Sequence, residues 1–463
     1  MVKNKAVRSQ FSSNMEENGK EMLVQKYLRF LESGELKFYS IEQALFAELG
    51  DWEKACSLAS IVRLKLIESK TNDTYPAIQK HSEAFCKPES KVVQIEQAIG
   101  SAIVPLGVAG PLKIKGTYAR GDFLIPLATN ESALIAGLSR GIKVVNIAGG
   151  VTTVVRYSCM TRAPLLRFNS IQSAKSAVDF LKADRSFFES LKSHISQESK
   201  HSKLIRVEPY MLNRYVWLRF VFDTSEAMGM NTATKLSALL LKKLKTVFPE
   251  MEIVALSGNL CTDKKSAHIN IINERGVGVE AEAVIPESVL GEVFGCSADD
   301  IISVNYVKNG LGSALAGTLG GFNANAANTV AAIFIATGQD CAQIVESSTA
   351  FVVCEKTRDA NDQGSSLKIG VSMPNIEVGT IGGGTGYHTA YECLKLLKCN
   401  NGKNGEAKAK LAEVICAAVL CQDLNLLATL AKEFKLAESH IKLARGESID
   451  SAGLFDNASN TRS

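Results

Sequence analysis

The stretch Asn309–Gln343, NGLGSALAGTLGGFNANAANTVAAIFIATGQDCAQ, decides which kind of protein this is. It contains the most membrane-like residues of the chain, 314–337, yet Asn323, Asn325 and Asn328 interrupt them, and glycine and alanine are frequent in the rest. A membrane span needs about 20 consecutive, predominantly apolar residues. Residues 314–337 therefore predict a buried helix of a folded domain, and we expect no transmembrane helix.

The chain around this stretch falls into segments of different texture. Residues 100–162 share its glycines and small residues, and they predict strands followed by a helix that begins near Thr129. Glycine and other small residues become less frequent after residue 162 and are frequent again after Lys264. The intervening segment predicts a helix at 170–190, a strand in YVWLRFVF, a loop in SEAMGMN, a helix at 232–248 and a short strand in EIVAL.

Helical periodicity marks both ends of the chain, over residues 20–85 and 408–441. We therefore predict an α+β protein in three parts. They are a helical N-terminal region, residues 1–99; a large α/β domain with a central buried helix, residues 100–162 and 266–463; and an inserted small domain, residues 163–265.

Composition excludes several classes of protein. Of the 463 residues, 46% are hydrophobic and 22% are charged, which is typical of a folded soluble chain rather than a disordered one. A formal net charge of +4 is too small for a general nucleic-acid-binding protein.

The 11 cysteines form no CxxC or Cys/His zinc pattern, which favours a reducing compartment and no metal site. The N-terminus has no apolar signal segment, so we expect a cytoplasmic protein.

The candidate nucleotide-binding segments are weak when they are taken alone. The turn Gly379–Gly386, GTIGGGTG, lacks the GxGxxG spacing and fits an ordinary tight turn as well. Gly229 lies between two methionines before the 232–248 helix, with Asn231 as the predicted N-cap. Backbone N–H groups there would point at an anion such as a pyrophosphate, whereas methionine pairs are more often core residues.

Several titratable residues allow both a structural and a catalytic interpretation. Glu131 is predicted in the first turn of a helix, where a carboxylate complements the helix dipole without any catalytic role. Asp340 follows the apolar run AAIFIATGQ, so we expect its carboxylate to be buried and to need a cation. Lys264 and Lys265 follow a strand, either as a solvated charge pair or as a strand-end site. His440, in AESHIKLAR, fits a surface histidine.

The order and spacing of the motifs together resemble the 3-hydroxy-3-methylglutaryl-CoA (HMG-CoA) reductase family from Gly100 to Arg445. The segments that carry the resemblance are PLGVAGPL, LATNESALIAGLSRG, MTRAP, EAMGMN, SGNLCTDKK, EAVIP, KNGLGSALAGTLGGFNANAAN, ATGQDCAQ, MPNIEVGTIGGGT and the SH of AESHIKLAR. CTDKK and the helical N-terminal region are similar to the family's first class, which is typically NADPH-dependent and tetrameric. The resemblance implies a catalytic region without a membrane anchor, in which residues 163–265 form a ferredoxin-like, cofactor-binding domain.

The resemblance also implies the reaction, a four-electron reduction of HMG-CoA to mevalonate and free CoA in the mevalonate pathway of isoprenoid biosynthesis. Two NADPH are consumed per turnover and no metal is needed. Hydride addition to the thioester builds negative charge on oxygen, and Lys264, oriented by Asp340, matches the cation that stabilises this charge. Glu131 matches the proton donor of the aldehyde path, and His440 matches the histidine that protonates the departing CoA thiolate.

The binding residues follow from the same resemblance. For the substrate's dicarboxylate end and its CoA, the matching residues are Arg162, Ser257, Asp263, Lys265, Lys308, Asn328, Arg140 and Lys143. For NADPH they are Glu226, Ala227, Met228, Gly229, Met230, Asn231, Ser202, Lys203, Gly382, Gly383, Thr385 and Arg445. Arg445, with Ser202 and Lys203, falls near the position of the 2′-phosphate, where a cation suits the anionic group.

Some positions depart from the family pattern and bear on the geometry of CoA and cofactor binding: Ser132, Ser139, Glu226, Asn325 and Gly446. They allow a rival interpretation, a catalytically inactive CoA-binding homologue. A second rival is an enzyme that runs in the oxidative, mevalonate-degrading direction. Because the catalytic matches are all retained, we favour the reductase. The family shares active sites between subunits, so the resemblance implies a homodimer or homotetramer, with no nucleic-acid partner and no membrane insertion.

Overall fold

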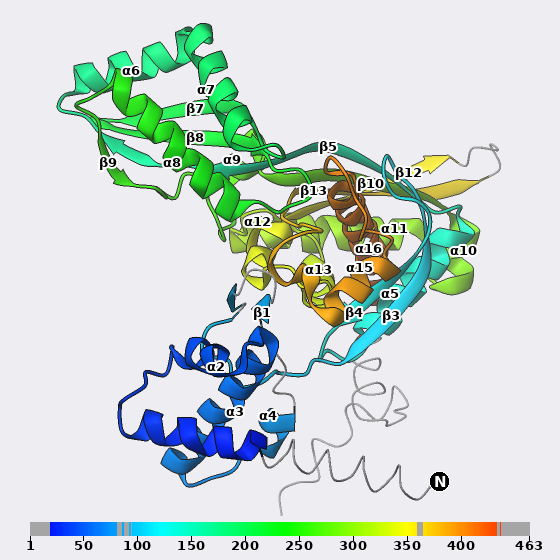
Figure 1. Ribbon diagram of the computed structural model, residues 1–463. Helices are drawn as coiled ribbons and strands as arrows, with labels where there is room; N and C mark the ends of the chain where they lie inside the picture. The colour runs from blue at the N-terminus through cyan, green and yellow to red at the C-terminus, as the bar shows by residue number, and fades with distance from the viewer. Residues whose placement is uncertain are drawn as a thin grey trace, which may run out of the picture. The chain divides into compact units, whose positions relative to one another are not determined.

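The computed structural model describes residues 19–80, 86–87, 92–93, 95–358, 364–432 and 436 (Figure 1). The chain divides into two compact units, Met1–Val104 and Pro105–Ser463. The expected α+β class is confirmed, because the second unit combines a large sheet with many helices. The predicted boundaries at residues 99, 163 and 265 stay predictions.

The first unit is helical, in agreement with its sequence periodicity. Its elements are a helix over residues 19–32, α2 (Ile41–Leu49), α3 (Trp52–Thr71), α4 (Pro76–Lys80) and the short strands β1 (Cys86–Lys87) and β2 (Val92–Val93). Apolar side chains that include Val24, Ile41 and Val62 form its core. Within this unit Arg63 pairs with Glu42 at 2.5 Å, and both side chains are buried.

The second unit is built on one mixed sheet of strand order β11-β12-β13-β10-β5-β8-β6-β9, with β3 beside β5, β4 beside β3 and β7 beside β8. The strands are β3 (Leu106–Lys115), β4 (Arg120–Ala128), β5 (Val151–Arg162), β6 (Leu165–Arg167), β7 (Lys203–Leu212), β8 (Tyr215–Asp223), β9 (Glu252–Ala255), β10 (Gly276–Pro286), β11 (Gly321–Phe322), β12 (Ala350–Arg358) and β13 (Ser365–Ile376). Strand β5 links two halves of the sheet, because residues 152–159 pair with β10 and residues 160–162 pair with β8. Arg162 therefore lies where the two halves meet.

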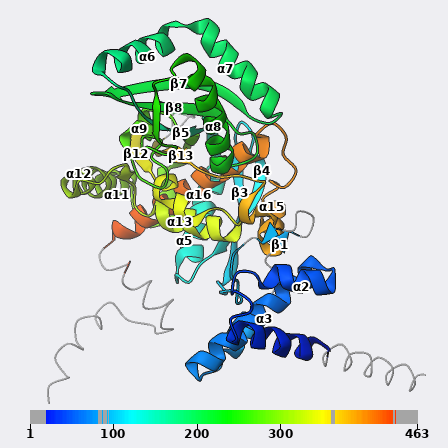
Figure 2. The same cartoon turned by 60° about the vertical axis from the view of Figure 1, so that its left-hand side comes forward.

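One half of the sheet packs on the long helix α16 (Glu406–Leu430), which also contacts α5 (Leu134–Ile147) and α13 (Ala326–Ala336) (Figures 1 and 2). Among the described residues, only α16 is long and apolar enough to cross a membrane, and 94% of its apolar window is buried inside the protein. Gly141 lets α5 approach it closely, because a Cβ there would lie 1.9 Å from the carbonyl oxygen of Cys421. The central buried helix of the large domain is therefore α16.

The predicted helix over residues 314–337 is wrong in its first half. The π-helix η1 (Asn305–Gly312) and α12 (Ser313–Ala316) end at Gly317, whose φ is 69°, and strand β11 intervenes before α13. Leu315 is 92% exposed, whereas Ile333 and Phe334 in α13 are fully buried. A glycine in the left-handed region commonly ends a helix, so the chain leaves the helical conformation at Gly317 instead of continuing into one buried helix.

The other half of the sheet has the strand order β7-β8-β6-β9, with every pair antiparallel. Helices α6 (Ile171–Ala183) and α7 (Arg185–Glu198) connect β6 to β7, and α8 (Met230–Val247) connects β8 to β9, around one shared apolar core (Figure 2). This is the ferredoxin-like βαββαβ order. The sequence patterns missed β6 and β7, and the single helix predicted at 170–190 is two helices, because Asp184 accepts the Phe187 N–H and starts α7.

Two helix starts near the predicted site residues differ from expectation. Helix α5 begins at Leu134 rather than near Thr129, so Glu131 precedes the helix instead of lying in its first turn. Helix α8 begins at Met230 after Gly229, whose φ is 98°, and Asn231 is therefore not the N-cap. The remaining helical segments are α9 (His268–Asn273), α10 (Glu287–Val293), α11 (Ala298–Val304), η2 (Cys341–Gln343), α14 (Ile344–Ser347), η3 (Gly383–Gly386) and α15 (His388–Leu396).

Candidate active site

A cavity of about 620 Å³, which we call the Lys264 cavity, lies at the junction of the two halves of the sheet. The end of β5, the start of α8, the loop after β9 and the turns after α13 and β13 all contribute to it. The predicted site residues that line it are Arg162, Ala227, Met228, Gly229, Met230, Asn231, Asp263, Lys264, Asp340, Gly382, Gly383 and Thr385. Segments far apart in the sequence thus converge on one site.

Lys264 and Asp340 form an ion pair at this cavity, with 3.1 Å between Nζ and Oδ2. The hydrogen bond that Lys264 donates to Asp340 is the main cause of a raised pKa for Lys264, so the lysine is charged at neutral pH. Asp340 thus has the cation that its sequence context requires, but its predicted burial is wrong, because its side chain is 38% exposed. Asp340 caps η2 by accepting the Ala342 N–H at 3.0 Å, which places its carboxylate beyond the end of α13.

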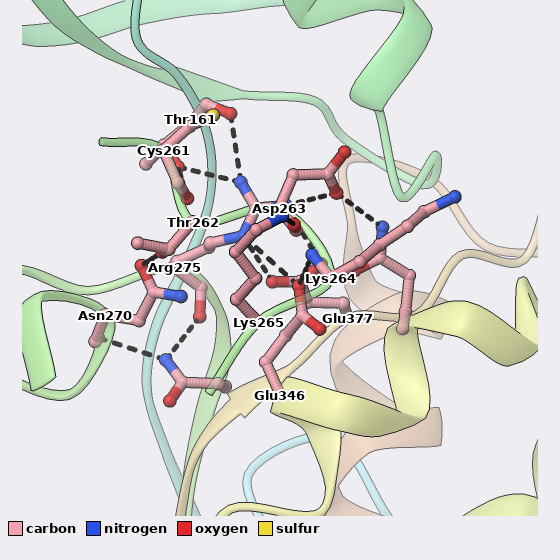
Figure 3. A network of polar contacts seen from close by, with 12 residues as sticks. Thr161, Cys261, Thr262, Asp263, Lys264, Lys265, Asn270, Arg275, Glu346 and Glu377 are labelled. Atoms are coloured by element: carbon pink, nitrogen blue, oxygen red, sulfur yellow. Dashed lines mark hydrogen bonds and ion pairs between the residues drawn. The ribbon is translucent and has the colours of Figure 1, made fainter. Parts of the chain in front are cut away.

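Behind Lys264, three acids surround one buried arginine (Figure 3). Arg275 bonds Glu377 at 2.5 Å and 3.1 Å and Asp263 at 3.0 Å, and it lies 3.9 Å from Glu346. Burial raises the pKa of Glu346 to about 7 and that of Glu377 well above its usual range. Carboxylate oxygens of the three acids lie close enough together to hold a metal ion, but the Arg275 guanidinium already supplies positive charge among them.

Arg162 presents the second cation of the Lys264 cavity. Its Nη1 donates to the Ser257 hydroxyl at 3.2 Å and lies 3.7 Å from the Asp263 carboxylate. Its buried Nε has no hydrogen-bond partner within the described residues. Lys265 donates to the main-chain carbonyl of Asp263 at 3.1 Å, so it belongs to the same loop although it does not line the cavity.

The loop before α8 and the turn Gly379–Thr385 lie side by side and form another wall. Ala227 pairs with Ile381 as an isolated parallel bridge. The Gln339 side chain fixes the turn, because its Oε1 accepts the Gly379 N–H and its Nε2 donates to the Gly379 carbonyl, both at 2.9 Å. Side chains added at Gly382 or Gly383 would enter open space, so the turn presents main chain to the cavity at these two positions.

Glu226 lies beneath this wall and does not line the cavity. Its carboxylate accepts hydrogen bonds from the Thr380 hydroxyl at 2.8 Å and from the main-chain N–H of Lys408 at 2.9 Å, which caps the N-terminus of α16. The Lys408 ammonium lies 3.4 Å from the Ala227 carbonyl, and burial lowers the pKa of this lysine to about 8. Glu226 therefore supports the loop from below, and its carboxylate does not line the Lys264 cavity.

A second cavity of about 330 Å³, which we call the Glu131 cavity, lies between α5, α13 and α16. Three predicted site residues line it, namely Glu131, Arg140 and Asn328. The Asn328 side-chain amide donates to the Glu131 carboxylate at 3.0 Å. Arg140 packs over the ring of Phe294 and donates to the Val293 carbonyl at 3.2 Å.

The other predicted binding residues lie outside both cavities. Lys308 is exposed on η1, Lys143 is exposed on α5, and Ser202 and Lys203 lie at the start of β7. His440 and Arg445 fall outside the described residues, so their predicted roles rest on the sequence alone.

The chain was compared with known proteins. The sequence model of the family described as hydroxymethylglutaryl-coenzyme A reductase matches residues 59–445. The chain belongs to the HMG-CoA reductase family. Relatives of that name include the protein of Pyrococcus abyssi, 38% identical over 92% of this chain and 100% of its own length. The protein of Aeropyrum pernix is 42% identical over 90% of this chain and 94% of its own length.

The same family appears among eukaryotes and solved structures. HMG-CoA reductase 1 of Dictyostelium discoideum is 36% identical over 92% of this chain and 74% of its own length. The class II HMG-CoA reductase of Streptococcus pneumoniae, solved with NADPH in open conformations, superimposes with a TM-score of 0.57 at 18% identity, over 80% of this chain and 96% of that one. This similarity shows a common fold.

Sequence reasoning missed the residues that support the Lys264 cavity from behind. They are Arg275, Gln339, Gln343, Glu346 and Glu377. A charged residue in an otherwise buried segment was the available signal, as in IVESS around Glu346 and MPNIEVG around Glu377. Their partners come from distant segments, so the pairing itself could not be read from the sequence.

Proposed function

We propose that this protein reduces HMG-CoA to mevalonate and free CoA and consumes two NADPH per turnover. The observation that carries the proposal is the Lys264–Asp340 pair, 3.1 Å apart, at a cavity that Arg162 also lines. An ion pair this exposed stabilises a fold by at most about 1 kcal/mol, which favours a role in chemistry over one in folding.

The residues of the Lys264 cavity fit a reduction at a carbonyl carbon. Negative charge develops on the oxygen when hydride reaches that carbon, and a fixed cation beside the oxygen lowers the barrier by several kcal/mol. Lys264 is the cation that we assign to this step, because Asp340 keeps it charged and oriented. Arg162, with a buried Nε that has no partner within the described residues, suits the carboxylate end of the substrate.

The residues opposite Lys264 suit a dinucleotide. When bound, NADPH supplies the hydride. We assign its pyrophosphate to the start of α8, where main-chain N–H groups favour an anion. The bare backbone at Gly382 and Gly383 leaves room for a close approach of the nucleotide. Lys264 and Arg162 are the described cations that line this cavity, and both already pair with acids, so a 2′-phosphate needs a further cation, for which we propose Arg445.

Glu131 is separated from Lys264 within one chain. It bonds Asn328 in the first turn of α13, whereas Asp340 lies beyond the last turn of the same helix. The helix rises about 12 Å from Asn328 to Ala336, at roughly 1.5 Å per residue. A proton donor and an oxyanion cation must reach the same carbonyl group, so we propose that Glu131 acts with Lys264 of a second copy of the chain.

Exposed apolar side chains support this assembly. Tyr306, Val307, Leu311 and Leu315 are exposed along η1 and α12, on either side of Lys308. Contiguous exposed apolar residues mark interaction surfaces. We propose that this segment packs on the second copy and brings Lys308 to the substrate. We also propose that His440 protonates the CoA thiolate as it leaves.

The test is to mix the protein with HMG-CoA and NADPH and to quantify NADPH oxidised, mevalonate formed and thiol released. We expect two NADPH consumed for each mevalonate and each thiol. CoA binding without NADPH oxidation would favour an inactive homologue. A parallel assay with mevalonate, CoA and NADP⁺ or NAD⁺ measures the oxidative direction, and oxidation far faster than reduction would contradict the proposed direction.

A further inference from the structure

The loop between β9 and α9, residues 256–267, carries Lys264, and we call it the Lys264 loop. Residues 340–346 contact this loop at three points. Asp340 pairs with the Lys264 ammonium, Gln343 donates to the Asp263 carboxylate at 2.8 Å, and Glu346 accepts the main-chain N–H of Lys264 at 2.6 Å. These contacts come from η2 and α14, which follow one another directly. The Lys264 side chain and main chain are therefore held by the same short segment.

The Lys264 loop needs such a restraint, because its backbone is strained. Lys264 has a φ of 60°, and the β-branched Thr262 nearby has a φ of 53°. A non-glycine residue in the left-handed region costs roughly 1–2 kcal/mol, and strained residues of this kind persist only when their surroundings fix them. A charge-assisted hydrogen bond to the Lys264 N–H is of the right strength to offset this cost.

Glu346 stands in an unusual electrostatic setting (Figure 3). It is 1% exposed, and the charged groups that face it are Asp263 and Lys264 from the loop after β9, Arg275 before β10, and Glu377 after β13. Arg275 bonds Asp263 and Glu377 directly but lies 3.9 Å from Glu346. The other oxygen of Glu346, Oε2, has no partner within the described residues. Of the three acids, Glu346 therefore has its charge compensated least by Arg275. Burial raises the pKa of Glu346 to about 7.

We propose that Glu346 is a positioning residue for Lys264: its carboxylate holds the Lys264 main chain in the left-handed conformation that presents the ammonium to the substrate. The ionised carboxylate is the stronger acceptor, so the charge state of Glu346 sets how firmly Lys264 is held. The kinetic part of this inference rests on the proposed reductase function.

The variants Glu346→Leu and Glu346→Gln separate the parts of the interaction, because leucine removes the acceptor and glutamine keeps an acceptor oxygen without the charge. Glu413→Gln is the matched control: Glu413 is equally buried and also accepts main-chain N–H groups, from Thr117, Tyr118 and Ala119, in a turn outside the Lys264 cavity. We expect kcat to fall roughly tenfold to a hundredfold in Glu346→Leu and less in Glu346→Gln. The KM for NADPH should stay within about twofold in both, and the control should keep its kcat.

The pH profile gives a readout that general destabilisation does not move. Since ionised Glu346 is the better acceptor, the wild-type kcat should rise as pH rises through about 7. Glu346→Gln cannot ionise and should lose this limb, whereas Glu413→Gln should keep it. A Glu346→Gln variant with the wild-type limb and wild-type kcat would overturn the proposal.

Hydrogen exchange tests the same contact without any activity. The Lys264 main-chain N–H should exchange at least about tenfold faster in Glu346→Leu than in wild type, the factor that corresponds to losing about 1.4 kcal/mol of protection. The control should leave it unchanged. Unchanged Lys264 exchange in Glu346→Leu would contradict the proposal even in an active enzyme. Faster exchange in a protein that does not reduce HMG-CoA would instead uphold the contact and reject the reductase function.

Discussion

The Lys264 cavity and the Glu131 cavity are built in different ways. Loops with left-handed residues and ion pairs form the first, and each of its cations has an acid within 4 Å. Three helices form the second, and it has buried amide oxygens without partners within the described residues, on Asn325, Gln422 and Asn425, whereas the first has two such polar atoms, Arg162 Nε and Gln343 Oε1.

This difference indicates in which cavity the cations are paired with acids of the same chain. The cations of the Lys264 cavity pair with acids of the same unit. Behind them, Arg275 is surrounded by Asp263, Glu346 and Glu377, which we call the Arg275 cluster. The Glu131 cavity presents a carboxylate and unpartnered amides, which are groups that a ligand or a second copy can satisfy. We therefore regard the first as the site of cation and cofactor, and the second as the half-site that supplies the proton donor.

The largest effect is expected at Glu131. Glu131→Gln should lower the reduction of free mevaldehyde by about 10²–10⁴-fold, because an amide cannot deliver a proton. Steady-state kinetics with mevaldehyde and NADPH measures this. The control is Glu282→Gln, which changes an exposed carboxylate paired with Lys368 on the sheet. Mevaldehyde reduction at the wild-type rate in Glu131→Gln would mean that the Glu131 cavity has no catalytic role.

Lys264→Ala should follow, with turnover reduced by about 10²–10³-fold and CoA binding retained, since one preorganised oxyanion donor is worth that much. Lys368→Ala removes a lysine of nearly the same exposure, 43% against 44%, whose partner Glu282 lies at 3.0 Å. Both variants remove one positive charge from an exposed ion pair, so a difference between their kinetics reports the position of Lys264 rather than the loss of a charge. Equal kinetics for the two variants would remove Lys264 from the mechanism.

The N-terminal helices and the segments that line the Lys264 cavity could be predicted, because periodicity and motifs act over short range. The ferredoxin-like topology was implied by the family resemblance, since the patterns missed two of its strands, β6 and β7. Glu131 and Lys264 were singled out as candidates, but their separation into two cavities was not predicted, since it depends on how α13 spans the fold. The start of α5 was missed because Ala133 adopts a φ of 72°, which its sequence does not favour. The Arg275 cluster was missed because its members lie in four separate segments.

Cofactor choice is the next and smaller effect. NADPH should be preferred over NADH in kcat/KM, and Arg445→Ala should reduce this preference by about tenfold to a hundredfold, the scale of one charge-assisted contact. Kinetics with both cofactors on both proteins decides this. A wild type that prefers NADH would contradict the assignment of Arg445 and the likeness to the family's first class.

The smallest effect concerns the frame of the Glu131 cavity and is on stability alone. Burial raises the pKa of Asp423 to about 6, above the usual aspartate value of about 3.9, although the carboxylate accepts the N–H groups of Ala324 and Asn325. A folded-state pKa that is raised stabilises the fold at low pH, and this stabilisation is lost as pH rises through about 6. The free energy of unfolding of wild type, relative to that of Asp423→Asn, should therefore fall by about 2–3 kcal/mol between pH 4 and 7, as thermal unfolding can measure. A difference independent of pH would contradict the raised pKa.

The central claim is that the two cavities of different copies combine into one active site. Glu131→Gln and Lys264→Ala chains can be co-expressed with different tags, and assemblies that carry both tags can be purified and assayed for HMG-CoA reduction. If Glu131 acts with Lys264 of the partner, a two-fold assembly of the two variants retains one intact site, so activity should return to roughly half of wild type. Activity no higher than that of the separate variants, in a mixed assembly that is folded and binds CoA, would contradict the claim.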